Sequence, residues 1–418
     1  MKLRLTISHY FTLYFFLLMG LYHYKIKHYF YWVYVAELKN NEFDFSVLRF
    51  FVATFLFFIN LILLNSLKKT KFIFIVLSIF FALLTIPSLI AFTSPGMYSV
   101  KLLWYHQGFF FALYVLSKVH IDFSKAPVIN KTQALYLLLG ITAIGIIPYL
   151  VVYGPHLNLK NLLLLDVYET RRSMINLSNP YFGYTYSIYT KIIIPLIIVF
   201  SLELKKKVWV FVGVLYLILF YLFGAHKTVY VGLFVVLVFY RLSFVQSVKY
   251  MVKYSNILIV LFTAFALIGY DYPWILSFRR IHFLPSLLDI CYVDYFEGNY
   301  LYWSESILKR FIEYPYDVRA TNLIGEVYFN RPDMSANNGL ISDGYMNFGT
   351  FGVVFNILLI SIYFMVLNSL KIPARYFGLF VITIFSFVSS SLFTVLLTHG
   401  GLALLIVSIF ILNNKRNE

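Results

Sequence analysis

The stretch SANNGLISDGYMNFGTFGVV, residues 335–354, joins a polar segment directly to a hydrophobic one. Its first part carries asparagines, glycines and Asp343, and the apolar run that follows continues to Leu367. An α-helix needs roughly 20 predominantly apolar residues to cross a bilayer. The stretch therefore predicts a membrane-spanning helix whose entrance is rich in hydrogen-bonding groups and, through its glycines, in backbone freedom.

The composition of the whole chain agrees with this interpretation. Hydrophobic residues make up 61% of the 418 residues and charged residues 12%, and the mean hydropathy is +0.79. Soluble globular proteins are about half apolar and about a quarter charged. The fold expected is thus an all-α polytopic membrane protein. Cys291 is the sole cysteine, which excludes an intrachain disulfide and a cysteine-based metal site.

About twelve segments are apolar enough to be membrane spans. They lie near residues 8–24, 46–65, 71–92, 102–117, 133–153, 186–203, 208–224, 228–242, 255–271, 349–368, 377–396 and 398–413. These spans predict a membrane domain over residues 1–270, a large outer loop over 271–350 and a second membrane part over 351–418.

Basic residues predict the orientation of these spans, because lysine and arginine accumulate in cytoplasmic loops. With the amino terminus inside, alternate short loops that are rich in lysine and arginine all fall on the cytoplasmic side. Their basic residues include Lys68, Lys69, Lys71, Lys118, Lys125, Lys131, Lys205, Lys206, Lys207, Lys249, Lys253 and Lys371, with Arg241 and Arg375. We attribute most of the net charge of +16 to topology, and we expect no nucleic-acid partner.

Two long loops then fall on the outer face, near residues 154–184 and 271–350. Loops of this length in a compact protein are usually functional or disordered. The second is rich in tyrosine, phenylalanine and tryptophan, which disordered segments lack. We expect it to fold as a cap on the membrane domain, with short helices near residues 302–313.

Basic pairs in and between these outer loops are the first candidate site residues. They could be solvated loop charge paired with nearby carboxylates. Adjacent cations in an apolar setting repel, however, and persist most readily when an anion neutralises them; the planar guanidinium suits phosphate in particular. We favour a pyrophosphate ligand for the pairs Arg171–Arg172, Arg279–Arg280 and His226–Lys227.

Several other chemistries are disfavoured by the motifs that the sequence lacks. It has no Walker-type phosphate loop, no HExxH or cysteine–histidine zinc spacing and no Asp-x-Asp pair that could hold a divalent cation. Acidic residues are nearly absent from the predicted spans, which argues against an ion-coupled transporter. No metal and no cofactor are expected.

The opening stretch also resembles a known motif. Its elements are an Asn/Gly-rich turn, an acidic residue followed by an aromatic one, and a Gly-x-x-Gly entry into a late span: Asn337, Asn338, Gly339, Asp343, Tyr345, Gly349 and Gly352. It is similar to the segment that ends the large periplasmic loop of O-antigen and capsular polysaccharide polymerases. The related O-antigen ligases usually begin this motif with histidine–asparagine, which disfavours a ligase here.

A second element of the resemblance lies in the first outer loop. Some of these polymerases carry an arginine, ten residues and a glycine, and RSMINLSNPYFG, from Arg172 to Gly183, has that spacing. In the later loop the nearest match runs from Arg331 to Gly344 with twelve residues between them. Arg331 is therefore a candidate substrate-binding residue whose role stays open.

The resemblance implies a fold of about twelve spans of the GT-C type and a defined reaction. Repeat units linked to undecaprenyl pyrophosphate would be polymerised on the periplasmic face of the bacterial inner membrane, with release of undecaprenyl pyrophosphate. The partners implied are the lipid-linked oligosaccharide, the bilayer and a chain-length regulator protein. A flippase for the lipid-linked unit, an O-antigen ligase and a structural or receptor role stay open as alternatives.

Each candidate residue then has an expected role. Preorganised cations stabilise charge on a leaving group most strongly in a water-poor site, so the basic pairs would hold the pyrophosphate. Asp343 is the first candidate for the base that acts on the acceptor hydroxyl, with a helix N-cap as its alternative role, and His282 is the second. The residues expected to bind sugar are Asn337, Asn338, Asn347 and, by ring stacking, Tyr345.

Overall fold

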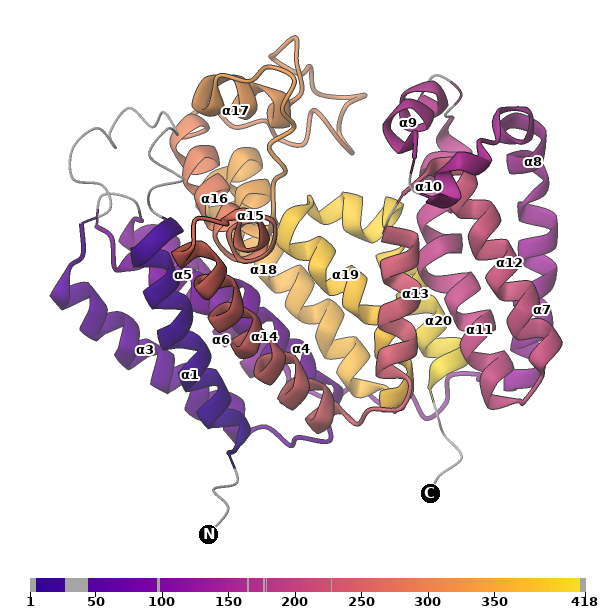
Figure 1. Ribbon diagram of the computed structural model, residues 1–418, viewed down its shortest axis with the longest axis horizontal. Coiled ribbons are helices and arrows are strands. Elements are labelled where there is room, and N and C mark those ends of the chain that lie inside the picture. Colours follow the sequence, from indigo (N-terminus) through magenta and orange to yellow (C-terminus); the bar gives the residue numbers. More distant parts are fainter. Residues whose placement is uncertain are drawn as a thin grey trace. The chain divides into compact units, whose positions relative to one another are not determined.

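The computed structural model describes residues 5–26, 44–95, 98–163, 165–175, 177, 179–226 and 228–413. Within these ranges the chain is helical and contains no strand (Figure 1). The helices form two compact units. Unit 1 combines Met1–His120, Phe244–Asn368 and Phe387–Leu392, and unit 2 combines Ile121–Ser243, Ser369–Ser386 and Phe393–Glu418. The whole outer loop predicted over 271–350 belongs to unit 1.

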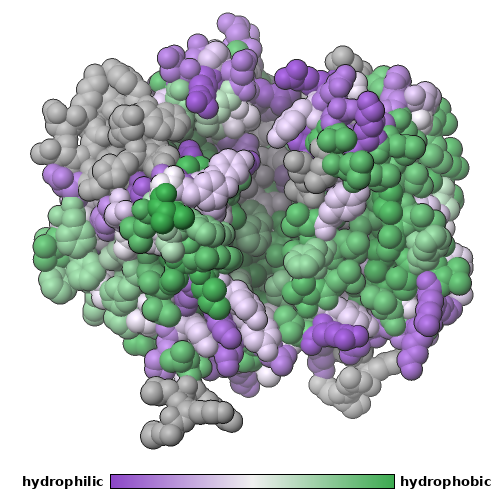
Figure 2. Space-filling view, viewed as in Figure 1, coloured by the Kyte–Doolittle hydropathy of each residue, from purple (hydrophilic) through white to green (hydrophobic). Residues whose placement is uncertain are grey.

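Seven helices of the described chain are long and apolar enough to cross a membrane. They are Val47–Ser66, Phe72–Phe92, Lys131–His156, Pro180–Glu203, Lys207–Gly224, Phe244–Leu267 and Leu340–Ser369. Hydrophobic side chains cover the middle of the helices and hydrophilic ones gather toward their ends (Figure 2). These features confirm a helical membrane protein at the level of fold class. The other predicted spans coincide with shorter helices, among them Val229–Phe239, Gly378–Ser389 and Gly401–Leu412.

Unit 1 is built around the span Phe72–Phe92, which is buried along its whole length. Its helices are α1 (Ile7–Leu21), η1 (Tyr22–Ile26), α3 (Val47–Ser66), α4 (Phe72–Phe80), η2 (Phe81–Thr85), α5 (Ile86–Phe92), α6 (Val100–Leu116), α14 (Phe244–Leu267), α15 (Tyr272–Trp274), η6 (Ile275–Phe283), α16 (Leu284–Tyr295), α17 (Ala320–Phe329) and α18 (Leu340–Ser369). Helices α1, α3, α6 and α14 all contact the central span. Phe57 stacks on Phe15 at 4.4 Å and on Phe81 at 5.6 Å between ring centroids, which joins three of these helices.

Unit 2 is centred on α11, whose residues from Ile194 to Ser201 are all buried. Its helices are α7 (Lys131–Gly145), α8 (Ile147–Tyr153), η3 (Gly154–His156), η4 (Leu159–Leu163), α9 (Val167–Ile175), α10 (Pro180–Ile188), η5 (Tyr189–Ile193), α11 (Ile194–Glu203), α12 (Lys207–Gly224), α13 (Thr228–Phe239), η7 (Ala374–Tyr376), α19 (Gly378–Ser389), η8 (Thr394–Thr398), α20 (Gly401–Val407) and η9 (Ser408–Leu412). Helices α7, α12 and α13 pack on α11. Gly213 of α12 lies so close to Ile198 that a side chain there would collide with it, the small-residue contact common between membrane helices.

Three wide π-helical segments come just before a proline. Segments η2, η5 and η6 end two residues before Pro87, Pro195 and Pro285. A proline ring clashes with the carbonyl one turn earlier and lacks an N–H, and a local π-bulge relieves both problems without ending the helix. Two of these segments hold charged or titratable residues at their wide turn, Lys191 in η5 and His282 in η6.

The outer loop differs from the sequence-based expectation in its helices. Short helices were expected near residues 302–313, but residues 302–311 form successive turns. Helices occupy instead the flanks of that region, as α16 and α17. The sequence of the turn region starts with Tyr302 and Trp303, which both adopt positive φ values, 51° and 57°. Two consecutive residues in that left-handed region prevent a helix from starting there.

Candidate functional site

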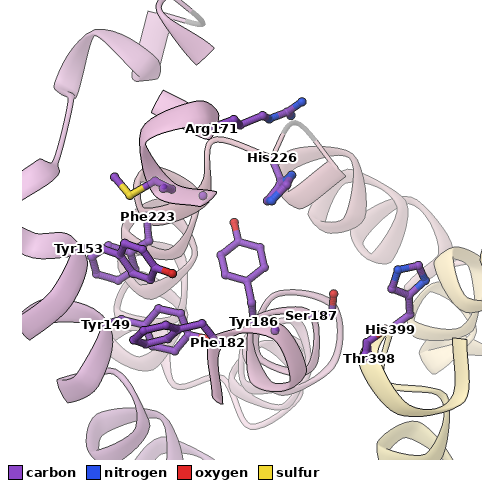
Figure 3. Close-up of a pocket in the computed structure, with 13 residues that line it drawn as sticks. Tyr149, Tyr153, Arg171, Phe182, Tyr186, Ser187, Phe223, His226, Thr398 and His399 are labelled. Atoms are coloured by element: carbon purple, nitrogen blue, oxygen red, sulfur yellow. The ribbon is translucent and has the colours of Figure 1, made fainter. Parts of the chain in front are cut away.

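A cavity of about 440 Å³ opens in unit 2, among the ends of α9, α10, α12 and η8 (Figure 3). Aromatic, cationic and small polar side chains line it together. They are Tyr149, Tyr153, Arg171, Met174, Phe182, Gly183, Tyr186, Ser187, Phe223, Gly224, His226, Thr398 and His399. None of these residues is acidic, so the lining carries a net positive charge from Arg171.

Arg171 is held in place by the end of α12. The helix stops because Ala225 adopts a left-handed conformation, with φ of 48°. Its carbonyl accepts hydrogen bonds from Nε and Nη2 of Arg171 at 3.1 and 2.9 Å. A cation at a helix C-terminus is also favoured by the helix dipole. A guanidinium has five N–H donors; these two bonds leave three for an anion in the cavity.

His226 lies on the exposed rim of the same cavity, directly after the end of α12. Its pKa is lowered to about 4, first because the surrounding protein desolvates the ring and secondly because Arg171 and Lys191 place positive charge nearby. The ring is therefore neutral near pH 7. The hydroxyl of Tyr186 points toward His226 (Figure 3), and the two ring centroids are 5.3 Å apart.

Lys191 was not singled out by the sequence analysis. It lies in η5, in the middle of the candidate span Pro180–Glu203, and its charge acts on both His226 and His399. A cation inside a membrane span is costly and by default marks a functional site. The signal was present in the sequence as the only charged residue between Arg172 and Glu203.

Aromatic rings form one wall of the cavity. Tyr149 packs against Phe182 at 4.7 Å and Phe223 at 5.7 Å between centroids, and Tyr153 lies 4.7 Å from Phe182. Tyr149 donates or accepts a 2.7 Å hydrogen bond with Thr185. Aromatic faces beside a cation suit a ligand that combines sugar rings with phosphate, since the rings offer apolar faces and the guanidinium offers charge.

The motif from Arg172 to Gly183 is only partly reflected in this geometry. Gly183 lines the cavity, but the arginine on its lining is Arg171, and Arg172 is exposed beside it. Lys227, the partner predicted for His226, lies outside the described residues. Of the basic-type residues predicted to hold pyrophosphate, the structure thus brings Arg171 and the neutral His226 together on one cavity.

The opening motif forms a broken helix in unit 1. Helix α18 runs from Leu340 to Ser369, but Phe348 and Gly349 leave helical geometry in its interior. Gly349 has φ of 58° and ψ of −142°, a backbone conformation that residues other than glycine rarely adopt. The freed carbonyls of Met346 and Asn347 accept hydrogen bonds from the N–H groups of Leu301 and Tyr302, at 2.8 and 3.1 Å.

Asp343 lies in the first half of this broken helix and is 3% exposed. One carboxylate oxygen accepts from the side chain of Asn356 at 3.2 Å and from the N–H of Leu392 at 3.0 Å. The other accepts from Asn338 at 3.4 Å. Asn347 donates to the backbone carbonyl of Asp343 at 2.8 Å. The carboxylate therefore connects both halves of the broken helix to the segment after α19.

The remaining motif residues divide into buried and exposed ones. Asn338 and Asn347 are buried in the network around Asp343, whereas Asn337 is exposed. The ring of Tyr345 is 1% exposed, and its hydroxyl accepts a 2.7 Å hydrogen bond from Lys101. Lys101 also lies over this ring at 4.5 Å. The face of Tyr345 predicted to stack on a sugar is thus occupied by a lysine of α6.

The cations and the histidine of the second loop lie elsewhere in unit 1. Arg279 is half-buried and Arg280 exposed in η6, and Arg331 is exposed after α17. His282 is buried and shares a short hydrogen bond with the hydroxyl of Tyr14. Burial lowers the pKa of His282 to about 3, which makes it a weak base. The convergence of these arginines with Arg171 on one diphosphate stays a prediction.

A buried histidine–aspartate hydrogen bond in unit 1 was also missed by the sequence analysis. His106 of α6 and Asp289 of α16 lie 3.1 Å apart, with side chains 1% and 5% exposed. The second oxygen of Asp289 accepts from the N–H of Ser342 in α18 at 3.1 Å. The pair therefore positions the first half of the broken helix. Its two members are separated by 183 residues, so no local spacing could have indicated it.

Comparisons with known proteins add nothing to the geometry. No protein-family model, no curated protein and no solved structure matches the chain.

Proposed function

We propose that the protein is a metal-independent glycosyltransferase that polymerises lipid-linked oligosaccharide repeat units. The donor would be a growing chain on undecaprenyl pyrophosphate and the acceptor a hydroxyl of another lipid-linked unit. The proposal includes a fold of twelve spans of the GT-C type in the bacterial inner membrane, with the reaction on the periplasmic face. The resemblance of residues 337–352 and 172–183 to polysaccharide polymerases supports it.

The observation that carries the proposal is the cavity around Arg171. It joins a guanidinium with three uncommitted N–H donors to an aromatic wall, and its lining holds no carboxylate that would repel an anion. A diphosphate attached to sugar at one end and to a polyprenyl chain at the other presents charge, ring faces and apolar tail together. In the cavity, Arg171 matches the charge and the aromatic wall matches the sugar ring faces.

In the proposed reaction the acceptor oxygen forms a bond to the anomeric carbon of the donor sugar. The bond between that carbon and the diphosphate oxygen breaks, and the proton of the acceptor hydroxyl ends on the departing diphosphate. Arg171, together with the field of Lys191, stabilises the charge that develops on the departing diphosphate. His226, neutral near pH 7 because its pKa is lowered to about 4, accepts a hydrogen bond from the acceptor hydroxyl and orients it; like His282, it is too weak a base to retain the proton.

The experiment is the glycan ladder of a strain from which the gene is deleted and then restored as variants. Deletion should leave surface glycan with a single repeat unit, and the wild-type gene should restore long chains. Arg171→Ala should leave the single unit, since removal of one such donor typically costs about 10²–10³-fold in rate. Arg172→Ala is the matched control and should keep the long ladder, because Arg172 is exposed beside the cavity.

Two results would contradict the proposal in different ways. A long ladder in the deletion strain would exclude polymerisation as the activity. If Arg172→Ala lost the ladder and Arg171→Ala kept it, the protein would still be a polymerase, but the cavity around Arg171 would not be its active site.

A further inference from the structure

A second cavity, of about 340 Å³, lies in unit 1 at the ends of four helices. It opens where α3 and α6 end, where α4 begins and where α18 approaches its end. Its lining residues are Ser66, Leu67, Lys68, Lys71, Ile73, Ser117, Lys118, Val119, His120 and Asn368. Three of the four helices are candidate membrane spans, so this cavity lies at the level where a span meets water.

The lining is basic and carries no acidic residue. Lys68, Lys71 and Lys118 contribute three ammonium groups, and among the described residues none of them forms an ion pair with a carboxylate. Lys118 lies over the ring of Tyr114 at 4.6 Å, a contact that leaves its charge uncompensated. All three lysines are exposed, so water screens their mutual repulsion, but an anion bound in the cavity would gain from all three ammonium groups together.

The cavity has a fixed polar frame. The side chain of Asn368 accepts a hydrogen bond from the N–H of Ile73 and donates one to the carbonyl of Ser117, both at 3.2 Å. Ser66 and Tyr114 share a 2.8 Å hydrogen bond that joins the ends of α3 and α6. The helix ends that carry the lysines are thus tied to one another, which preorganises the site.

Apolar surface continues from this site along the neighbouring helices. Ile62 of α3 is 68% exposed, and Phe111 and Val115 of α6 are 57% and 43% exposed. In a bilayer these side chains face acyl chains. A ligand with a phosphate at the helix ends and hydrocarbon along the helices would therefore contact both parts of the surface, whereas free phosphate would contact only the lysines.

We propose that this cavity binds the phosphate of an anionic phospholipid. Basic pockets between membrane helices on the cytoplasmic side are a recognised place for such headgroups, and the lysine-rich loops here are those that the charge pattern assigns to the cytoplasm. The site lies in unit 1, whereas the proposed catalytic cavity lies in unit 2. The two proposals can therefore fail independently.

The test uses the full-length protein purified from nanodiscs that contain equal amounts of phosphatidylglycerol and phosphatidylcholine. Native mass spectrometry then counts the lipid that stays bound. Wild type should retain phosphatidylglycerol in preference to phosphatidylcholine. The triple variant Lys68→Gln, Lys71→Gln, Lys118→Gln should lose this preference by about tenfold or more, as expected when several charge-assisted contacts are removed.

Two control variants separate the site from general charge and from folding. The triple variant Lys207→Gln, Lys249→Gln, Lys253→Gln removes the same charge from α12 and α14, at residues that do not line the cavity, and should keep the preference. The triple variant Lys68→Arg, Lys71→Arg, Lys118→Arg keeps the positive charge and should also keep the preference for phosphatidylglycerol. Equal loss in the first control, or no preference in wild type, would overturn the proposal. So would a thermal shift with inorganic phosphate as large as that with phosphatidylglycerol, which would identify a free anion as the ligand.

Discussion

The carboxylate of Asp343 accepts hydrogen bonds from groups of the protein itself. Asn356 and Leu392 donate to one oxygen and Asn338 to the other, and only 3% of the residue is exposed. Removing a buried acceptor by mutation leaves its donors without a hydrogen bond, which costs about 1–3 kcal/mol for each unsatisfied group. The structure therefore favours a positioning role over the role of base that the sequence suggested.

A pair of variants separates these two roles. Asp343→Asn keeps an acceptor oxygen toward Asn356 and Leu392, so we expect a melting temperature and a glycan ladder close to wild type. Asp343→Ala removes all three acceptor contacts and should lower the free energy of unfolding by on the order of 2–5 kcal/mol, with loss of the ladder. Thermal unfolding in detergent and the ladder are measured side by side. A stable but inactive Asp343→Asn protein would restore the catalytic interpretation.

His282 makes the stability of unit 1 dependent on pH. Burial lowers its pKa to about 3, whereas an unfolded histidine titrates near pH 6.5. Between these values the unfolded chain binds the proton and the folded chain does not, so the folded state loses stability as the pH falls below about 6.5. At pH 5 the loss is on the order of 2 kcal/mol.

The measurement is the melting temperature of wild type and His282→Gln between pH 7 and pH 5. Glutamine can keep a hydrogen bond to Tyr14 but has no proton to gain, so its melting temperature should fall less with acid. His156→Gln, at an exposed position in η3, should follow wild type. Parallel curves for wild type and His282→Gln would show that this histidine does not govern the acid response.

At the scale of elements, α18 is broken at a residue that requires glycine. Besides its positive φ, Gly349 faces the ring of Tyr300 so closely that a Cβ would lie 2.6 Å from the hydroxyl. Gly344 and Gly352 approach each other on either side of the break, where a Cβ on Gly352 would lie 2.1 Å from the carbonyl oxygen of Gly344. The glycines of the motif thus serve the close packing of the two half-helices, and the residues they position are those around Asp343.

Gly349→Ala should therefore destabilise the protein. Backbone strain of about 1–3 kcal/mol is expected at such a position, and the contact with Tyr300 adds to it. Gly140→Ala is the matched control, because a Cβ there meets nothing within 4 Å and alanine favours a helix. The melting temperature should fall with the first variant and stay level or rise with the second. A normal melting temperature for Gly349→Ala would mean that the break is not needed for stability.

At the scale of the whole molecule, the sequence predicted the helices better than the site. Every predicted span overlaps a helix, because hydrophobic runs of that length have one structural outcome in a bilayer. The helix limits were less accurate: α14 begins at Phe244 and α18 at Leu340, earlier than residues 255 and 349. Both extensions are polar or mixed in sequence, so hydropathy alone could not include them.

The candidate site was predicted only where the relevant residues were close in sequence or shared a motif. Arg171 was identified from its charge, but its exposed neighbour Arg172 had the motif spacing. The choice between the two depends on the left-handed end of α12, which local sequence does not reveal. His106 and Asp289 meet across 183 residues, and Tyr345 is covered by Lys101 across 244. Such pairs follow from tertiary packing and need coordinates.

The twelve-span topology makes a prediction that covers the whole chain. With the amino terminus inside, Lys69 would face the cytoplasm and Lys309 the periplasm, and both are exposed. Cys291 is the sole cysteine and is buried, so wild type should give little background with a maleimide reagent. In intact cells a membrane-impermeant maleimide should label Lys309→Cys and not Lys69→Cys, and after permeabilisation it should label both. Labelling of Lys69→Cys in intact cells would place the lysine-rich loops outside. Equal access of both sites would require an even number of crossings between them, whereas the predicted count, from the third to the ninth span, is odd.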